Sequence, residues 1–310
     1  MKTRLLLLIS FGSIIVSFSE FWFYKVDKDV GHFTIILAYG VMGYFFLVAL
    51  KYYEVRTMAA FWVAASLFGF LAEGVPVAVL YSGLPLTIVW TSLAWHALLS
   101  VGIGWFAFKK IMGGKSILRA VLLNAAIGLG LGLWNGYMWN AVIDDTSEVL
   151  SFAWQRPEIF TKQFLIGYVL FVIGHFVFER SARTVPDFKT FEILALGIIL
   201  AVISLLGAAA SGLWIFFPIL PFLVFICILA LQRSKNTVSQ EPELLTVMRF
   251  NKIPVWRYAL TLLIPLVAIS TYFTVFHLQI GLEMNAIVIA IAGPVSLFLF
   301  ARGIWKCMKN

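Results

Sequence analysis

The chain has 310 residues, of which 62% are apolar and 12% are charged, and its formal net charge is +8. A soluble domain carries about 25% charged residues, so a water-exposed surface cannot be built from this supply and lipid must cover much of the chain. The composition therefore excludes a soluble enzyme and a secreted domain. It predicts an all-α fold, namely a polytopic helical membrane protein that forms a single transmembrane domain over residues 1–310.

Ten apolar segments follow one another along the chain, and a spanning helix needs about 20 mostly apolar residues. The first begins like a signal peptide, but its apolar run is longer than a signal sequence uses, which favours an uncleaved first span. The run 191–231 is too long for one span and is expected to break at 208–212, giving segments seven and eight. The other eight segments are expected at 4–24, 32–50, 58–80, 86–108, 120–140, 164–178, 258–278 and 286–305.

The 23 Lys and Arg residues lie almost entirely in every second gap between these segments. The exceptions are Lys25, Lys28, Arg156 and Lys162. Basic residues collect on the cytoplasmic side of membrane proteins, so both termini are expected in the cytoplasm of a cell that carries the protein in its plasma membrane. The same placement explains the net positive charge through loops beside anionic lipid and argues against nucleic acid as a partner.

Ten spans divide into five and five, and a repeat of five helices inverts between its two copies. We expect halves at 1–140 and 164–310, joined by an outer amphipathic loop at 141–163. Prolines interrupt the third segment of each half, at Pro76 in the first and at Pro218 and Pro221 in the second. Matching breaks of this kind are typical of transporters that bind their substrate near the membrane midplane.

The loop at 141–163 contains Asp144-Asp145-Thr146-Ser147-Glu148. A single string of this kind is a weak signal for diphosphate-bound magnesium. A capping box, with Asp145 as the N-cap of a short interfacial helix, is the better interpretation. The four His and two Cys residues have no metal-ligand spacing, so we expect no metal and no cofactor.

Glu73 is the strongest candidate for a functional residue. An ionisable group at membrane depth is costly and therefore marks a functional site, with a named partner to compensate it. Gly74 and Pro76 follow directly, and proline removes a backbone hydrogen bond, so the helix is expected to kink or break beside the carboxylate. The alternative is a kinked structural helix in which Glu73 is paired internally.

His96 is the expected partner of Glu73. Ser92, His96 and Ser100 recur at intervals of four, which places them on one face of a helix. The short turn 81–85 makes this helix an antiparallel neighbour of the one that carries Glu73. We therefore expect the two side chains to approach each other beside an internal cavity and to handle protons, although a lone His is more often a satisfied core residue.

Three further polar features are expected to serve packing or to line a pathway. Ser10, Ser13, Ser17 and Glu20 fall within roughly an 80° arc of the first segment, which indicates either close helix packing or a polar path that ends at Glu20. Glycines at 128, 132 and 136 predict close helix packing, within the chain or across a homo-oligomer. His277 is expected to line the path near the outer surface, whereas His175 and Glu179 are expected at the inner interface.

Three classes of function are compatible with these features. The first is a small transporter or permease, proton- or ion-coupled, whose pathway contains Glu73, His96, Glu20, Ser92 and His277. The second is an intramembrane enzyme that acts on a lipid or isoprenoid at the outer leaflet, with Glu20, Glu73 and His277 near His32 and Asp144. The third is a non-catalytic membrane subunit whose glycine face docks a partner. We expect the transporter, with a small-molecule or lipid substrate that the sequence does not identify.

Overall fold

The computed structural model describes residues 2–23, 32–75, 79–143, 149–181, 197–198, 201–202, 218–236 and 241–309. This part of the chain is helical, apart from one short hairpin. The longer helices are α1 (Lys2–Val16), α2 (His32–Tyr52), α3 (Met58–Gly74), η3 (Ile88–Ala107), α5 (Ile117–Met138), α6 (Pro157–Ser181), α8 (Ile219–Asn236), α10 (Leu263–Leu278) and α11 (Met284–Lys309). The shorter elements are η1 (Ser17–Phe21), η2 (Val79–Tyr81), α4 (Phe108–Met112), β1 (Ala141–Ile143), β2 (Val149–Phe152), α9 (Leu244–Phe250) and η6 (Val255–Leu262).

Eight of the described helical stretches are long and apolar enough to cross a membrane. They correspond to the predicted segments 1, 2, 4, 5, 6, 8, 9 and 10. The third segment folds as α3, which has 17 residues and is therefore about 26 Å long, slightly short of the hydrocarbon core. The predicted segment seven lies outside the described residues. A multi-pass helical membrane protein is thus confirmed, while the total of ten spans and their inverted repeat stay predictions.

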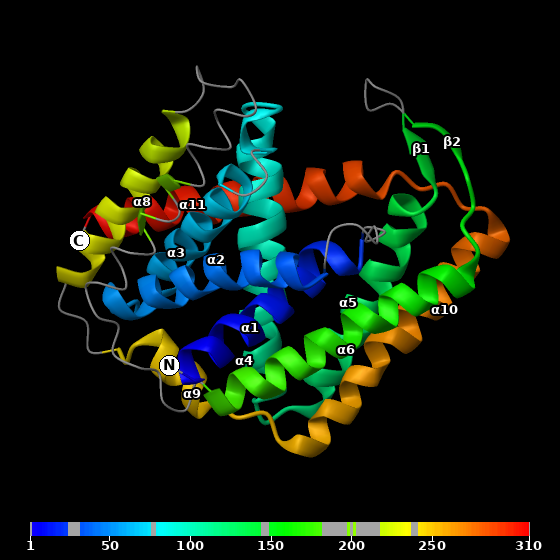
Figure 1. The fold of residues 1–310 in the computed structure, drawn as a ribbon, viewed down its shortest axis with the longest axis horizontal. Helices are drawn as coiled ribbons and strands as arrows, with labels where there is room; N and C mark the ends of the chain where they lie inside the picture. The colour runs from blue at the N-terminus through cyan, green and yellow to red at the C-terminus, as the bar shows by residue number, and fades with distance from the viewer. Residues whose placement is uncertain are drawn as a thin grey trace.

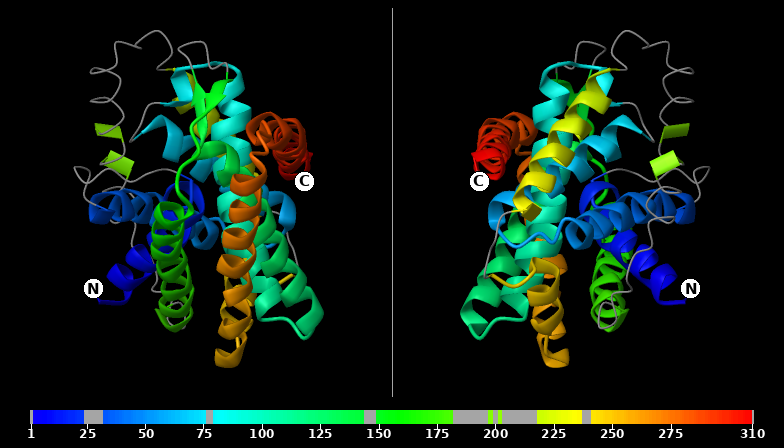
Figure 2. Two further views of the ribbon diagram at one scale, coloured as in Figure 1. Left: turned by 90° about the vertical axis from the view of Figure 1, so that its right-hand side faces the viewer. Right: turned by 90° about the vertical axis from the view of Figure 1, so that its left-hand side faces the viewer.

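The helices pack as a bundle in which η3 is central (Figure 1). One side is built by α1, α2 and α6 and the other by α3, α8 and α11, and η3 contacts α3, α11 and α1. Figure 2 shows α6 and α10 running nearly alongside each other, and α10 also packs along α5. Helices far apart in sequence, such as α1 and α6, therefore meet around η3, where the largest buried side chains, including Phe11, Trp22 and Trp105, fill the core.

The fourth predicted segment is a helix but not an α-helix. It forms η3, a π-helix in which the hydrogen bonds span five residues, as the bond from the Phe108 amide to the Ile103 carbonyl illustrates. The Ser100 hydroxyl likewise donates to the carbonyl five residues back, at Trp95. A second π-helical turn, η1, ends the first segment. Wide turns of this type occur mostly at functional sites in proteins.

The predicted break after Glu73 is confirmed, because α3 ends at Gly74. Pro76 lies outside the described residues. In the second half, α8 begins at Ile219, directly after Pro218, and Pro221 lies in its first turn, where the missing amide has no intrahelical partner. Residues 203–217 lie outside the described residues, so a matching break there stays a prediction. A proline within a helix lies instead in α11, at Pro294.

The loop at 141–163 differs from the expected interfacial helix. Strands β1 and β2 pair as an antiparallel hairpin, and α6 begins at Pro157 rather than at 164. Asn140 holds the hairpin base, because its side-chain oxygen accepts from the Gln155 amide and from the Tyr272 hydroxyl. Asp144–Glu148, including the predicted capping box, lie outside the described residues.

The glycine face of α5 packs within the chain. A methyl group built at Gly128 or Gly132 would lie 2.7 Å from the Ile264 carbonyl or 2.6 Å from the Ala268 carbonyl of α10. At Gly136 it would lie 2.6 Å from the Val275 side chain. The small residues therefore allow the two backbones to approach closely, as the sequence predicts. A homo-oligomer through this face would have to displace α10.

We expect Gly132→Ala to destabilise the protein and Gly130→Ala to stabilise it. The new methyl group at 132 would overlap α10, and overpacking costs about 1–3 kcal/mol. A methyl group at 130 meets nothing within 4 Å, so the better helix propensity of alanine, about 1 kcal/mol, remains as a gain. Thermal unfolding of the two variants in the same detergent measures the difference. Equal unfolding temperatures would contradict the close approach of α5 and α10.

Candidate functional site

Glu73 and His96 form a hydrogen-bonded pair inside the bundle. The Nε2 atom of His96 lies 2.5 Å from Oε1 of Glu73, and the residues are 1% and 7% exposed. Glu73 occupies the last turn of α3 and His96 the middle of η3, so the short connection between these helices brings them together. Their predicted approach is confirmed. The ring of His96 lies between those of Tyr39 and Phe68, at centroid distances of 5.7 and 6.2 Å, and the internal cavity expected beside the pair stays a prediction.

Hydroxyl groups extend from the other side of the imidazole. Ser19 Oγ lies 3.3 Å from His96 Nδ1 and 2.8 Å from Ser100 Oγ, and the Ser100 hydroxyl donates to the Trp95 carbonyl at 2.9 Å. A hydroxyl has one proton to donate. In one order of donation, Ser100 gives its proton to Trp95, Ser19 donates to Ser100, and Ser19 accepts from the Nδ1–H of His96.

This order of donation determines what joins His96 to Glu73. With Nδ1 carrying a proton, the bond between Nε2 and Oε1 contains one further proton, which belongs either to an imidazolium or to a carboxylic acid. In both forms the pair has no net charge, which makes it tolerable in an apolar interior. Loss of that proton leaves one negative charge. The second carboxylate oxygen, Oε2 of Glu73, is buried and has no hydrogen-bond partner in the described structure.

Glu20 is the second carboxylate of this region. It lies in η1, is partly buried, and accepts a hydrogen bond from the Tyr39 hydroxyl of α2. The ring of Tyr39 also packs against His96, with 5.7 Å between the ring centroids. Glu20 is close enough to interact with the charges of both His96 and Glu73. The site therefore brings together two carboxylates, one imidazole and one phenol from η1, α2, α3 and η3.

The remaining predicted residues take different places. Ser92 is fully buried near the Gly69 backbone, and its hydroxyl has no partner in the described structure. The hydroxyls of Ser10, Ser13 and Ser17 donate to carbonyls of their own helix, which agrees with a packing role. His277 is exposed in the last turn of α10, a helix that packs on α5 and α6, and its ring contacts Phe273 and Phe276. It is not part of the Glu73 cluster.

One end of the bundle contains a polar cluster around Lys109, His175 and Glu179, and the predicted position of His175 and Glu179 at the inner membrane interface stays a prediction. Lys109 is 1% exposed, and its Nζ lies 2.7 Å from Oε1 of Glu179. Glu179 also accepts from the Ile253 amide and the Tyr258 hydroxyl, so every oxygen has a donor. His175 is likewise fully buried, one helical turn before Glu179, and bonds to the Gly104 carbonyl. These contacts tie η3, α4, α6 and η6 together, while Nδ1 of His175 has no hydrogen-bond partner in the described structure.

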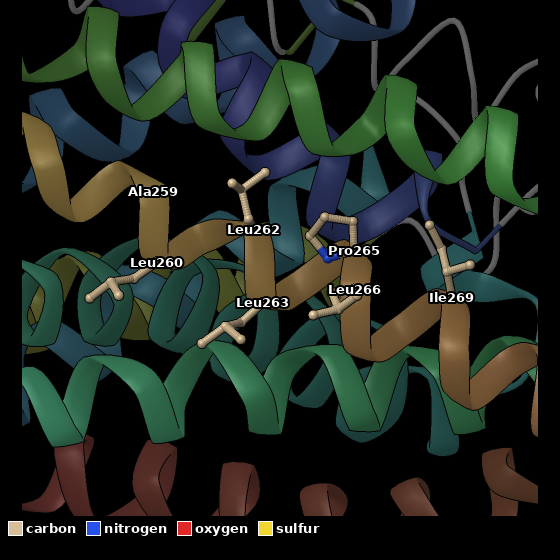
Figure 3. A pocket seen from close by; sticks show the side chains of 7 residues that line it. All are labelled: Ala259, Leu260, Leu262, Leu263, Pro265, Leu266 and Ile269. Carbon is tan, nitrogen blue, oxygen red and sulfur yellow. The ribbon is translucent and has the colours of Figure 1, made fainter.

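An apolar groove of about 510 Å³ lies elsewhere, on α10 (Figure 3). It is lined by seven side chains of η6 and α10, which Figure 3 shows between the ribbons of α5 and α6, namely Ala259, Leu260, Leu262, Leu263, Pro265, Leu266 and Ile269. All seven side chains are apolar, so they offer neither an acid nor a hydrogen-bonding group for chemistry. None of them belongs to the Glu73 site.

Ser19 and Tyr39 are functional candidates that the sequence analysis missed. Ser19 lies outside the arc formed by Ser10, Ser13 and Ser17, and only the π-helical turn and the packing of η1 on η3 bring it to His96. Tyr39 lies in an apolar helix with no polar pattern. The sequence could have indicated Tyr39 as a neighbour of Glu20, because the first two helices are joined by a short connection and pack along each other.

No protein-family model, curated protein or solved structure matches this chain. Among the described residues no group of three or more His, Cys, Asp or Glu is placed to hold a metal ion. Fold and site therefore define the class directly: the chain is a multi-pass helical membrane protein with a carboxylate–imidazole pair buried in its bundle.

Proposed function

We propose that this protein is a small proton-coupled transporter and that the Glu73–His96 pair is its proton-binding site. The observation that carries the proposal is the 2.5 Å contact between two titratable groups in the interior of a membrane protein. Ionisable residues in that environment are expensive, and proton pathways are one of their main uses. The pair takes up or releases one proton while His96 keeps its contact to Ser19.

The arrangement supports transport better than lipid chemistry at the outer leaflet. The enzyme interpretation requires Glu20, Glu73 and His277 around one chamber. Glu20 lies beside the pair, but His277 is exposed on α10. Asp144 and the side chain of His32 lie outside the described residues. The subunit interpretation depends on a free glycine face, and α10 covers that face.

The test uses proteoliposomes that contain the purified protein and the pH-sensitive dye pyranine. Solutes from separate classes are added outside, namely amino acids, sugars, nucleosides, carboxylates and organic amines, and internal pH is recorded. We expect one class to move protons in the wild type and none to do so in Glu73→Gln, because glutamine keeps the shape but cannot release a proton. His277→Ala serves as the control that retains activity. If no class moves protons in the wild type, proton-coupled transport is wrong.

We propose further that the protein lies in the plasma membrane with both termini in the cytoplasm. The alternation of basic residues supports this orientation. Ten spans in two inverted halves remain part of this proposal.

Single cysteines test the orientation, in a background in which Cys227 and Cys307 are replaced by serine or alanine. Glu158→Cys, at the exposed start of α6, should react with a membrane-impermeant maleimide in intact cells. Lys115→Cys, exposed before α5, should react only after the membrane is permeabilised. The reverse pattern would place the termini outside.

A further inference from the structure

A cluster of four aromatic side chains adjoins the Glu73–His96 pair. The aromatic cluster is formed by Phe23, Trp90, Trp95 and Trp134. Ring centroids lie 4.5 Å apart for Phe23 and Trp134, 4.8 Å for Trp95 and Trp134, and 5.5 Å for Trp90 and Trp95. Trp90 is partly exposed, whereas the other three are buried. The aromatic cluster therefore extends from the protein surface into the interior.

The inner end of the aromatic cluster is joined to the proton site. The indole Nε1 of Trp95 donates to the Ser19 carbonyl at 3.1 Å, and Ser19 is the residue whose hydroxyl contacts His96. Trp134 is fixed at the other edge by a 2.6 Å bond to the Asn285 side chain of α11. The indole bonds orient the rings of Trp95 and Trp134, and Ser19 connects the aromatic cluster to His96.

The polar groups available near the pair favour a cation. Oε2 of Glu73 is an unpartnered acceptor on a residue that is only 7% exposed, and an acceptor of this kind requires a donor. Glu20 adds a second carboxylate. The buried cations Lys109 and Arg257 are engaged elsewhere, by Glu179 and by the carbonyls of Met112 and Lys115. An anionic substrate would meet carboxylates and no free cation among these groups.

Aromatic faces attract cations, and ammonium groups are bound in aromatic surroundings for this reason. We propose that the substrate is a hydrophobic amine in its protonated form, whose N–H⁺ donates to Oε2 of Glu73 while its apolar body replaces the mutual packing of the aromatic cluster. This inference rests on the proposed transport function. The charges balance: the pair releases one proton and becomes negative by one charge, and the bound ammonium restores neutrality. Protons and amine therefore compete for one site.

The experiment compares two ligands with the same naphthyl ring and opposite charge. Propranolol carries a protonated amine, and 1-naphthoxyacetate carries a carboxylate. Binding of each radiolabelled compound to the purified protein in nanodiscs is measured by scintillation proximity, with empty nanodiscs as the background. We expect saturable binding of propranolol alone, weaker at lower pH because protons compete, and no pH dependence in Glu73→Gln.

Trp90 provides the variant that separates recognition from folding, because it is only partly buried. Trp90→Leu should weaken propranolol binding roughly tenfold, and Trp90→Phe should restore most of it, since the π face returns. Trp305→Leu, an exposed tryptophan on α11, is the matched control and should bind like the wild type.

Equal binding of the two ligands, or propranolol binding that Trp90→Leu leaves unchanged, would overturn the inference. The pyranine assay reports the proposed function separately. If another class of solute moves protons and propranolol does not bind, the transport proposal stands and the amine proposal is wrong. If propranolol binds through Trp90 and no solute moves protons, the cation site stands and proton coupling is wrong.

Discussion

His96→Leu is expected to lower the free energy of unfolding by about 3–5 kcal/mol, which is the usual cost of removing one member of a buried ion pair. The variant leaves the Glu73 carboxyl in the interior without the contact at Oε1, in addition to an Oε2 that already has no partner. Protonation of Glu73 removes the charge but not the unmet hydrogen bond. Ser19 also loses its hydrogen bond with Nδ1 of the imidazole.

The double variant Glu73→Met/His96→Leu should recover most of this loss, because a buried pair replaced by apolar groups of similar volume is often neutral or stabilising. Chemical denaturation in detergent at one pH measures all three proteins. His277→Leu, at an exposed histidine, is the matched control and should change stability by no more than about 0.5 kcal/mol. A double variant as unstable as His96→Leu would show that packing, rather than the unpaired carboxyl, sets the cost.

Lys109→Ala should lower the free energy of unfolding by about 3–5 kcal/mol, while Lys110→Ala should leave it nearly unchanged. The two lysines are adjacent and carry the same charge, but Lys109 is buried against Glu179 and the Asn251 carbonyl, and Lys110 is exposed. Without Lys109, Glu179 keeps its bonds to Ile253 and Tyr258 but loses its counter-charge.

The contacts of Lys109 and Glu179 also predict which segment of Lys109→Ala unfolds first. Glu179 and Lys109 together hold the segment from Asn251 to Tyr258 against α4 and α6. Protease sensitivity or hydrogen exchange in residues 244–258 should therefore rise in Lys109→Ala at temperatures at which the helices remain folded. Increased exchange spread evenly over the chain would contradict a local role.

The Glu73–His96 contact is the part of the site that the sequence predicts best. The sequence predicts a short turn at 81–85, and in the structure η3 follows α3 after residues 75–87, so the two helices are neighbours and residues near their connection have few alternative partners. The end of α3 at Gly74 is local as well, because it follows from Gly74 and Pro76. Contacts between helices that follow one another in the chain depend mainly on the connection between them.

Contacts that join distant helices were not predictable in this way. Ser19 lies 77 positions from His96, and Lys109 lies 70 positions from Glu179. Their meeting depends on how each helix is rotated about its axis. Helix η3 additionally departs from the α-helical period, so a face derived from four-residue spacing identifies His96 and Ser100 but not their common neighbour.

The sequence alone determined that this protein crosses a membrane many times, because apolar length and the placement of basic residues act on each segment separately. Only the tertiary structure decided which distant polar residues meet: Ser19 and Glu20 join the Glu73–His96 pair, the glycines of α5 receive α10, and His277 stays apart. The physical reason is that transfer into lipid is a property of single segments, whereas hydrogen bonds and ion pairs require two side chains from separate helices at one depth and one rotation.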